Sequence, residues 1–214
     1  MQLDVDAILF DIDGTLVDST PAVERSWRAW AARRQLDAEA ILSICHGRRS
    51  EDTIRSLVSP DEVAAAVREI EELELGDLSD VVALPGAAAL LPRLPVGRWA
   101  AVTSGPHGLM RARLAAAGLP VPQVLVAAED VRAGKPEPEG YLAAASALGF
   151  DAAQCLVIED APAGIAAGRA AGATVVAVTT SHAAADLDAD VVIPDLRACA
   201  VDVGDGRLTV TTRG

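Results

Sequence analysis

A change of pattern near residue 84 constrains the fold more than any other feature of this sequence. From Leu84-Pro85-Gly86 onward, short apolar runs alternate with alanine-rich stretches of helical character. The apolar runs are residues 99–102, 124–127, 155–158, 174–178 and 191–193. A buried parallel strand is a short apolar run, and the crossover between two such strands is usually a helix. The alternation therefore predicts βαβ units, with a parallel sheet covered by helices.

The N-terminal segment predicts one further strand and a long helical region. Residues 7–10 are continuously apolar and stop at Asp11, as expected of a buried strand. From Thr20-Pro21, interpreted as an N-cap and a first helical position, the pattern is helical to about residue 75. We expect an α/β fold: a doubly wound, Rossmann-like core from residues 1–17 and 84–214, with an α-helical cap domain inserted at 18–83. A hairpin over residues 201–212, turning at 204–206, is expected at the end.

The charge balance limits the partners to be expected. The formal net charge of −13 argues against nucleic acid, because phosphate backbones are bound by clustered lysines and arginines. No run approaches the roughly 18 apolar residues that cross a bilayer, and the first residues lack the basic region of a signal peptide. We therefore expect a cytoplasmic protein without membrane contact, monomeric by default.

Lysine and cysteine usage is informative. Among the 18 basic residues only Lys135 is a lysine, in the segment Ala-Gly-Lys-Pro-Glu-Pro. A solvated surface cation would be the ordinary interpretation if lysines were common here.

The three cysteines, Cys45, Cys155 and Cys199, are far apart and lack the paired spacing of zinc sites, which predicts reduced thiols.

Polar residues gather where the predicted strands end. They are Asp11-Ile12-Asp13-Gly14, Thr103-Ser104-Gly105 and Glu159-Asp160, with Lys135 in a loop. Ligand sites in open parallel sheets lie beyond the carboxyl ends of the strands. Asp-x-Asp-Gly also occurs in ordinary loops and calcium loops, and hydroxyls or acids after a strand also cap helices, so each pattern alone leaves these interpretations open.

Taken together, these groups suit phosphoryl transfer assisted by Mg²⁺. Carboxylates are hard oxygen ligands for the metal, while an ammonium, a hydroxyl and backbone N–H groups can hold phosphate oxygens. In this order the four segments resemble the motifs of the haloacid dehalogenase superfamily. The resemblance covers nearly the whole chain, including a helical cap inserted after the first motif.

The resemblance implies a role for each motif residue. Asp11 would be the nucleophile that forms an aspartyl phosphate, and Asp13 the general acid and base. Ser104, Lys135, Gly105 and Gly14 would bind phosphate. The Mg²⁺ ligands would be the Asp11 carboxylate, the Asp13 main-chain carbonyl and Asp160, with Glu159 either a ligand or one step further out.

Within the superfamily the chain looks most like 2-deoxyglucose-6-phosphate and glycerol-phosphate phosphatases, which implies a small sugar or polyol phosphate as substrate. The cap segment 45–52 carries part of this likeness, and its Arg49, Ser50 and Asp52 are candidates to contact substrate. The alternative is a charged helix start exposed to water, with Ser50 as its cap.

The main rival function is a sugar phosphomutase resembling β-phosphoglucomutase. Such mutases carry a histidine soon after the first motif, where this chain has Val23, and a lysine in the cap, where this chain has none. The missing cap lysine also disfavours a phosphonoacetaldehyde hydrolase, which needs an amine nucleophile. Asp13 disfavours a true dehalogenase, and the complete motif set disfavours a non-catalytic binding module.

Overall fold

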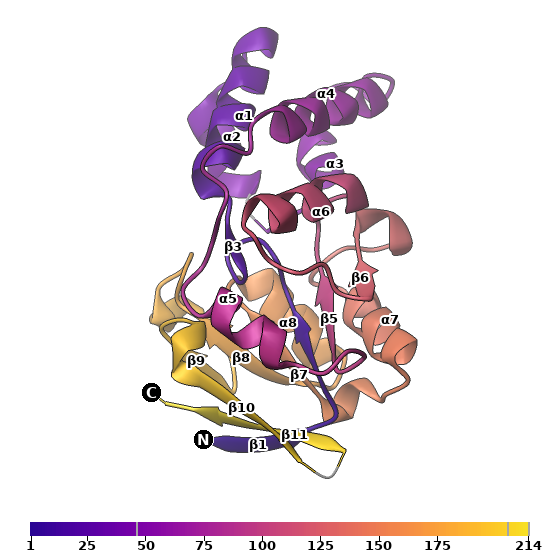
Figure 1. Ribbon diagram of the computed structural model, residues 1–214. Coiled ribbons are helices and arrows are strands. Elements are labelled where there is room, and N and C mark those ends of the chain that lie inside the picture. The colour runs from indigo at the N-terminus through magenta and orange to yellow at the C-terminus, as the bar shows by residue number, and fades with distance from the viewer. Residues whose placement is uncertain (46, 205, 214) are drawn as a thin grey trace.

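The computed structural model of the protein describes residues 1–45, 47–204 and 206–213, and within them the central layer is a six-stranded parallel sheet (Figure 1). The strand order is β6 (Val124–Val126), β5 (Trp99–Val102), β2 (Ala7–Phe10), β7 (Cys155–Glu159), β8 (Thr174–Val178) and β9 (Val191–Ile193). All residues of β2, β5 and β7 are buried, which is why these strands are continuously apolar up to their last residues. The predicted strands and the α/β fold class are confirmed.

Helices cover both faces of this sheet. Alternate residues of β2 point to opposite faces: Ile8 and Phe10 pack with α5 (Ala87–Leu90) and α6 (His107–Ala116), whereas Ala7 and Leu9 pack with α7 (Glu139–Leu148) and α8 (Pro162–Ala170). In the described part of the chain the connections also contain short 3₁₀ helices, which are η1 (Leu91–Arg93), η2 (Ala128–Asp130), η3 (Ala152–Gln154), η4 (Ala184–Asp186) and η5 (Leu196–Ala198).

The two ends of the chain meet in a separate antiparallel sheet of order β1-β11-β10. β10 (Cys199–Gly204) and β11 (Arg207–Thr212) form the predicted hairpin, although residue 205 of its turn lies outside the described residues. β1 (Gln2–Val5) pairs with β11 and was not expected, because four residues with two polar side chains carry too little pattern.

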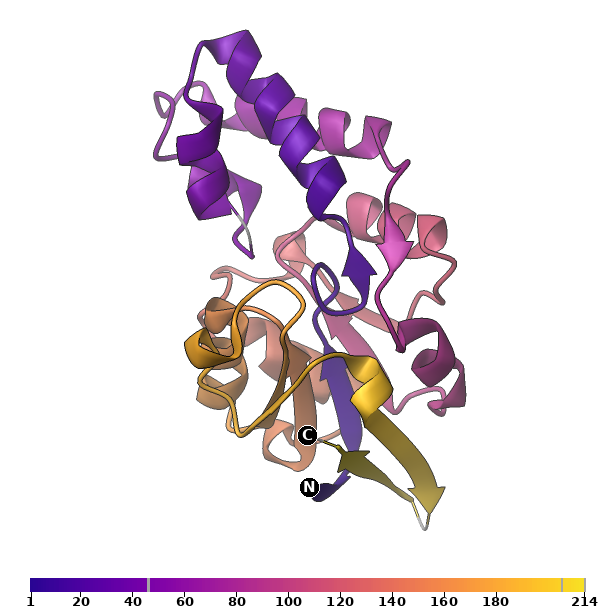
Figure 2. The ribbon, with the colours of Figure 1, turned by 90° about the vertical axis from the view of Figure 1, so that its left-hand side faces the viewer.

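The helical region between Asp18 and Val82 packs on itself, away from the sheet (Figure 2). Its helices are α1 (Thr20–Arg34), α2 (Ala38–Cys45), α3 (Ser50–Ile54) and α4 (Val63–Gly76), and residues 20–76 are called the cap below. Trp27 and Trp30 pack edge to face, 5.5 Å apart, within its own apolar cluster. The cap is joined to the sheet by paired strands β3 (Val17–Asp18) and β4 (Val82–Ala83), which lie at the expected domain boundaries; the division into two domains stays a prediction.

The start of α1 differs by one residue from the prediction. Ser19, not Thr20, occupies the N-cap position, and Thr20 is the first helical residue before Pro21. The Ser19 hydroxyl makes no capping bond, because it donates to Asp13 instead. Ser19 therefore belongs to the polar site.

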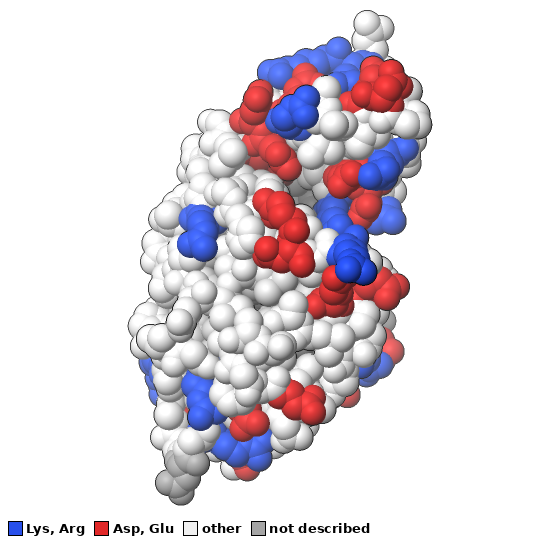
Figure 3. All heavy atoms as spheres, turned by 90° about the vertical axis from the view of Figure 1, so that its right-hand side faces the viewer, with Lys and Arg blue, Asp and Glu red and all other residues white. Residues whose placement is uncertain are grey.

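The cap surface carries interspersed charges, visible as adjacent blue and red atoms in the upper part of Figure 3. Arg25 bonds Asp77 and Asp80 at 2.8 and 2.7 Å, and Arg34 bonds Glu69 at 2.9 Å. The Arg25 pairs are largely exposed, and such pairs contribute little to stability individually, whereas the Arg34–Glu69 pair is partly buried. Among the described residues, no helix has both the length and the apolar character needed to cross a membrane.

Candidate active site

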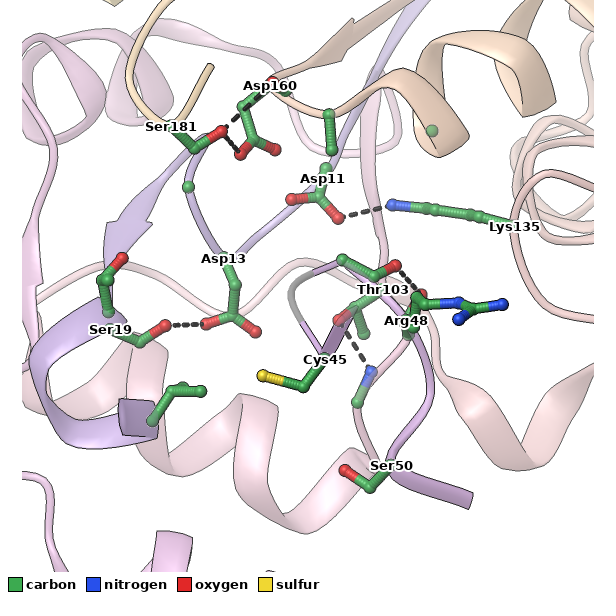
Figure 4. A pocket seen from close by; sticks show the side chains of 18 of the residues that line it. Asp11, Asp13, Ser19, Cys45, Arg48, Ser50, Thr103, Lys135, Asp160 and Ser181 are labelled. Atoms are coloured by element: carbon green, nitrogen blue, oxygen red, sulfur yellow. Dashed lines mark hydrogen bonds and ion pairs between the residues drawn. The ribbon is translucent and has the colours of Figure 1, made fainter. Parts of the chain in front are cut away.

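The predicted motif residues come together at the carboxyl ends of three neighbouring strands. β2 lies between β5 and β7, so Asp11, Thr103 and Glu159 reach the same edge of the sheet although up to 148 positions separate them. They line a cavity of about 530 Å³ between this edge and the cap, called the main cavity below. Figure 4 shows Asp11, Asp13, Lys135 and Asp160 facing one another there.

Lys135 is the buried cation of this cluster. Its Nζ donates to Asp11 Oδ1 at 2.5 Å, to Glu159 Oε1 at 2.6 Å and to the Val102 carbonyl at 3.2 Å. Burial alone would lower the pKa of Lys135, but the charges of Asp11 and Glu159 outweigh burial and raise it. The lysine is therefore a fixed positive charge beside the predicted nucleophile.

Glu159 holds this lysine in place. Its Oε1 also accepts from the Tyr141 hydroxyl at 2.9 Å, and its Oε2 accepts the backbone N–H groups of Asp160 and Ala161 at 2.9 and 3.3 Å. Each oxygen thus already has two donors. This arrangement favours the second of the two predicted roles, one step removed from the metal, and that assignment remains a prediction.

Asp160 points into the cavity rather than capping α8, whose N-cap position is Ala161. Its carboxylate accepts hydrogen bonds from the Thr15 hydroxyl at 3.3 Å and from the Ser181 hydroxyl. Gly14, with φ +87°, passes so close that a Cβ there would lie 2.1 Å from Asp160 Oδ2. Glycine is needed at this position for both its backbone conformation and its lack of a side chain.

The buried carboxylates are short of positive charge. Oxygens of Asp11, Glu159 and Asp160 lie within 4.8 Å of one another, and their residues are 7%, 1% and 5% exposed. Burial, opposed by Lys135, raises the pKa of Asp11 well above its usual range; burial and the Glu159 charge raise that of Asp160 to about 7. Three buried acids facing one lysine suit a hard divalent cation such as Mg²⁺.

Asp13 is held by two donors that the sequence did not reveal. Its Oδ1 accepts from the Ser19 hydroxyl at 2.7 Å, and its Oδ2 accepts from Arg113 Nη1 at 2.7 Å. Arg113 lies on the buried face of α6 with Leu109, Met110 and Leu114. An arginine at helical spacing among apolar residues is the signal that could have identified it.

The segment after β5 supplies the predicted phosphate-binding groups. Ser104 and Gly105 line the main cavity, and the Ser104 hydroxyl donates to the Gly47 carbonyl of the cap at 3.1 Å. A Cβ on Gly105 would lie 2.5 Å from the end of the Met110 side chain. Their role in phosphate binding remains a prediction.

The cap residues are distributed differently from the expectation. Ser50 lines the main cavity, but Arg49 and Asp52 do not; Arg48 does instead. Arg49 donates to the carbonyls of Val131 and Arg132, in the core loop that leads to the lysine, at 3.1 and 3.3 Å. The side chain of Asp52 is exposed at the start of α3. Which arginine of the pair faces the cavity could not be read from their adjacency.

Three known proteins are similar to this chain. Hexitol phosphatase A of Escherichia coli is 47% identical over 79% of this chain and 81% of its own. Glycerol-1-phosphate phosphohydrolase 2 of Saccharomyces cerevisiae is 35% identical over 88% of this chain and 79% of its own. The crystal structure of a hydrolase from Pseudomonas syringae superposes with a TM-score of 0.80 and 27% identity, covering 89% of this chain and 94% of that one.

A family model gives the same result over most of the sequence. The model of haloacid dehalogenase-like hydrolases matches residues 5–172, which include all four motifs and the cap. The resemblance noted from the sequence is therefore confirmed, and the chain belongs to the haloacid dehalogenase-like hydrolase family.

Proposed function

We propose that this protein is a Mg²⁺-dependent phosphatase that hydrolyses a small sugar or polyol phosphate through an aspartyl phosphate on Asp11. The observation that carries the proposal is the contact between Asp11 and the chain's single lysine inside a buried acidic cluster. The names of the hexitol phosphatase and the glycerol-1-phosphate phosphohydrolase support a phosphorylated polyol as the substrate class.

Asp11 is suited to attack phosphorus. Lys135 engages its Oδ1, and among the described residues Oδ2 has no hydrogen-bond donor, so this second oxygen is the one available for bonding to phosphorus. Two anions, the carboxylate and the phosphate, must approach each other, and Lys135 reduces their repulsion. Bound Mg²⁺ would be held by Asp11, the Asp13 carbonyl and Asp160, and would supply further charge neutralisation.

Asp13 is placed to move the protons of both half-reactions. In the first, the P–O bond to the leaving alkoxide breaks as the bond to Asp11 forms, and Asp13 donates a proton to the alkoxide. In the second, Asp13 takes a proton from the water that attacks phosphorus, and the bond to Asp11 breaks to release inorganic phosphate. Asp13 ends each cycle protonated, ready for the next substrate.

The main cavity suits a small polar leaving group. Beyond the motif residues it is lined by cap side chains that include Glu24, Trp27, Arg48 and Ser50. Carboxylate, guanidinium and hydroxyl groups can exchange hydrogen bonds with a polyol, while Trp27 supplies an apolar wall. We also retain as proposals a monomeric state, a cytoplasmic location and the absence of a nucleic-acid partner.

A panel assay tests the proposal. Purified protein is incubated with hexitol, hexose and glycerol phosphates, with Mg²⁺ or with EDTA, and both free phosphate and isomerised sugar phosphate are measured. We expect phosphate release that requires Mg²⁺ and falls by at least about 1,000-fold in Asp11→Asn, because the nucleophile is lost. Undiminished hydrolysis by Asp11→Asn contradicts the mechanism, and isomerised product in place of phosphate indicates a mutase.

A further inference from the structure

A buried ion network links the cap to Asp13. Arg113 of α6 donates through Nη1 to Asp13 Oδ2 at 2.7 Å and through Nη2 to Glu74 Oε1 at 3.0 Å. Glu74 belongs to α4 of the cap, and α4 packs beside α6, as Figure 1 shows. We propose that Arg113 is a positioning residue for proton transfer by Asp13, and that Glu74 of the cap holds Arg113 in the orientation this requires.

The network fixes the Asp13 carboxylate from two sides. Ser19, directly before the first cap helix, holds one oxygen, and Arg113 holds the other (Figure 4 shows the Ser19 bond). The Asp13 side chain is 30% exposed, so packing alone does not restrict its rotation about χ2. The two hydrogen bonds therefore decide which oxygen faces the reacting phosphate ester.

Burial makes Arg113 dependent on Glu74. Their side chains are 4% and 6% exposed, respectively. A buried guanidinium needs partners for its charge. Asp13 and Glu74 balance the charge of Arg113 and accept from its Nη1 and Nη2, whereas its Nε has no hydrogen-bond partner among the described residues. Because Glu74 reaches Arg113 from the cap, the complete network forms only when the cap lies against the core. The position of the cap therefore affects the orientation of Asp13, the predicted general acid.

A comparison of two leaving groups distinguishes an effect on the orientation of Asp13 from a general loss of structure. An alkoxide is a strong base and must receive a proton as it leaves, whereas p-nitrophenolate leaves without one. If Arg113 and Glu74 orient Asp13, disturbing them slows the first half-reaction for alkyl phosphates much more than for p-nitrophenyl phosphate. A general loss of structure slows both alike. This inference rests on the proposed phosphatase function.

The test compares kcat/KM for glycerol 1-phosphate and p-nitrophenyl phosphate in Glu74→Gln and Arg113→Lys. The value kcat/KM reports the first half-reaction, so the shared hydrolysis of the phospho-enzyme does not enter. Glu72→Gln and Arg111→Lys, at exposed positions on the same two helices, are the matched controls. Thermal melting of every variant checks that it is folded.

We expect Glu74→Gln to lower kcat/KM for glycerol 1-phosphate roughly 10- to 100-fold, within the contribution of general acid catalysis, and to change it less than about 3-fold for p-nitrophenyl phosphate. Arg113→Lys should show the same selectivity, because an ammonium cannot span both carboxylates as a guanidinium does. The controls should match the wild type. If Arg113→Lys does not fold, Glu74→Gln alone decides.

Equal losses on the two substrates, or no loss in a folded Glu74→Gln variant, would overturn the inference while leaving phosphatase activity of the wild type intact. A wild-type protein that releases phosphate from neither substrate would instead overturn the proposed function, and this inference with it. The two failures are therefore distinguishable in the same experiment.

Discussion

Gly164 provides a sharp test of the way in which Glu159 is held. It lies in α8, and a Cβ built there would be 1.6 Å from Glu159 Oε1 and 2.0 Å from Cδ. No real Cβ makes such contacts, so in Gly164→Ala either the Glu159 carboxylate or the helix must move. A shift of the carboxylate would weaken the hydrogen bonds that it accepts from Lys135, Tyr141 and two backbone N–H groups.

The size of the effect follows from these contacts. Hydrogen bonds to a charged group contribute about 2 kcal/mol each, and we assume that a displaced carboxylate loses two of its four donors. Alanine is about 1 kcal/mol better than glycine in a helix, which offsets part of the loss. The net destabilisation is about 3 kcal/mol, and for a chain of this size it lowers Tm by roughly 6–12 °C.

The assay is thermal unfolding followed by circular dichroism, with Gly108→Ala as the matched control. Gly108 lies in the first turn of α6 with nothing within 4 Å of its added Cβ, so the same substitution there should stabilise by about 0.5 kcal/mol. Opposite signs at the two glycines support the packing described here. A Gly164→Ala variant that melts at or above the wild type would show that α8 accommodates a methyl group and would refute the reasoning.

Three further outcomes are expected. Burial raises the pKa of Cys45 to about 12 and the pKa values of Cys155 and Cys199 to about 11. Ellman's reagent at pH 8 should therefore label the thiols of the native protein far more slowly than those of the urea-unfolded protein. Equal labelling rates would contradict the burial of these thiols. The pKa of Asp160 lies near 7 when folded and 3.8 when unfolded, so metal-free protein should lose stability as pH rises between these values, and Mg²⁺ should raise Tm more at pH 8 than at pH 5. An Asp160→Asn variant that keeps both effects would exclude this carboxylate as their source. Arg48→Ala should raise KM for polyol phosphates selectively, because Arg48 lines the main cavity. Arg49→Ala removes the bonds between the cap and the loop before Lys135, and it should lower kcat/KM for all phosphate esters alike. Identical substrate profiles of the two variants would contradict the different placement of the two arginines.

Much of the fold followed from local pattern. Each central strand is a short apolar run because helices bury both of its faces, so its position was predictable from composition along a few residues. β1 was missed because an edge strand with polar residues depends on its partner β11, far along the chain, rather than on its own sequence. The start of the first cap helix was placed within one residue, whereas its end at Arg34 was not predicted.

The sequence by itself determined which chemical groups the site contains: the carboxyl groups of Asp11, Asp13 and Glu159-Asp160, and the ammonium group of the single lysine. Parallel strands bring their carboxyl ends to one edge, so this convergence was already implied by the order of the motifs.

Only the tertiary structure decided which further side chains complete the site. Arg113 of α6 meets Asp13 across 100 positions, and Glu74 reaches the same arginine from helix α4 of the cap. Arg48 lines the main cavity, whereas Arg49, the N-cap residue of a five-residue helix, bonds to Val131 and Arg132 of the core. The physical reason is that periodicity indicates which face of an element is buried, whereas the partner of a buried charge is set by how separate elements pack together.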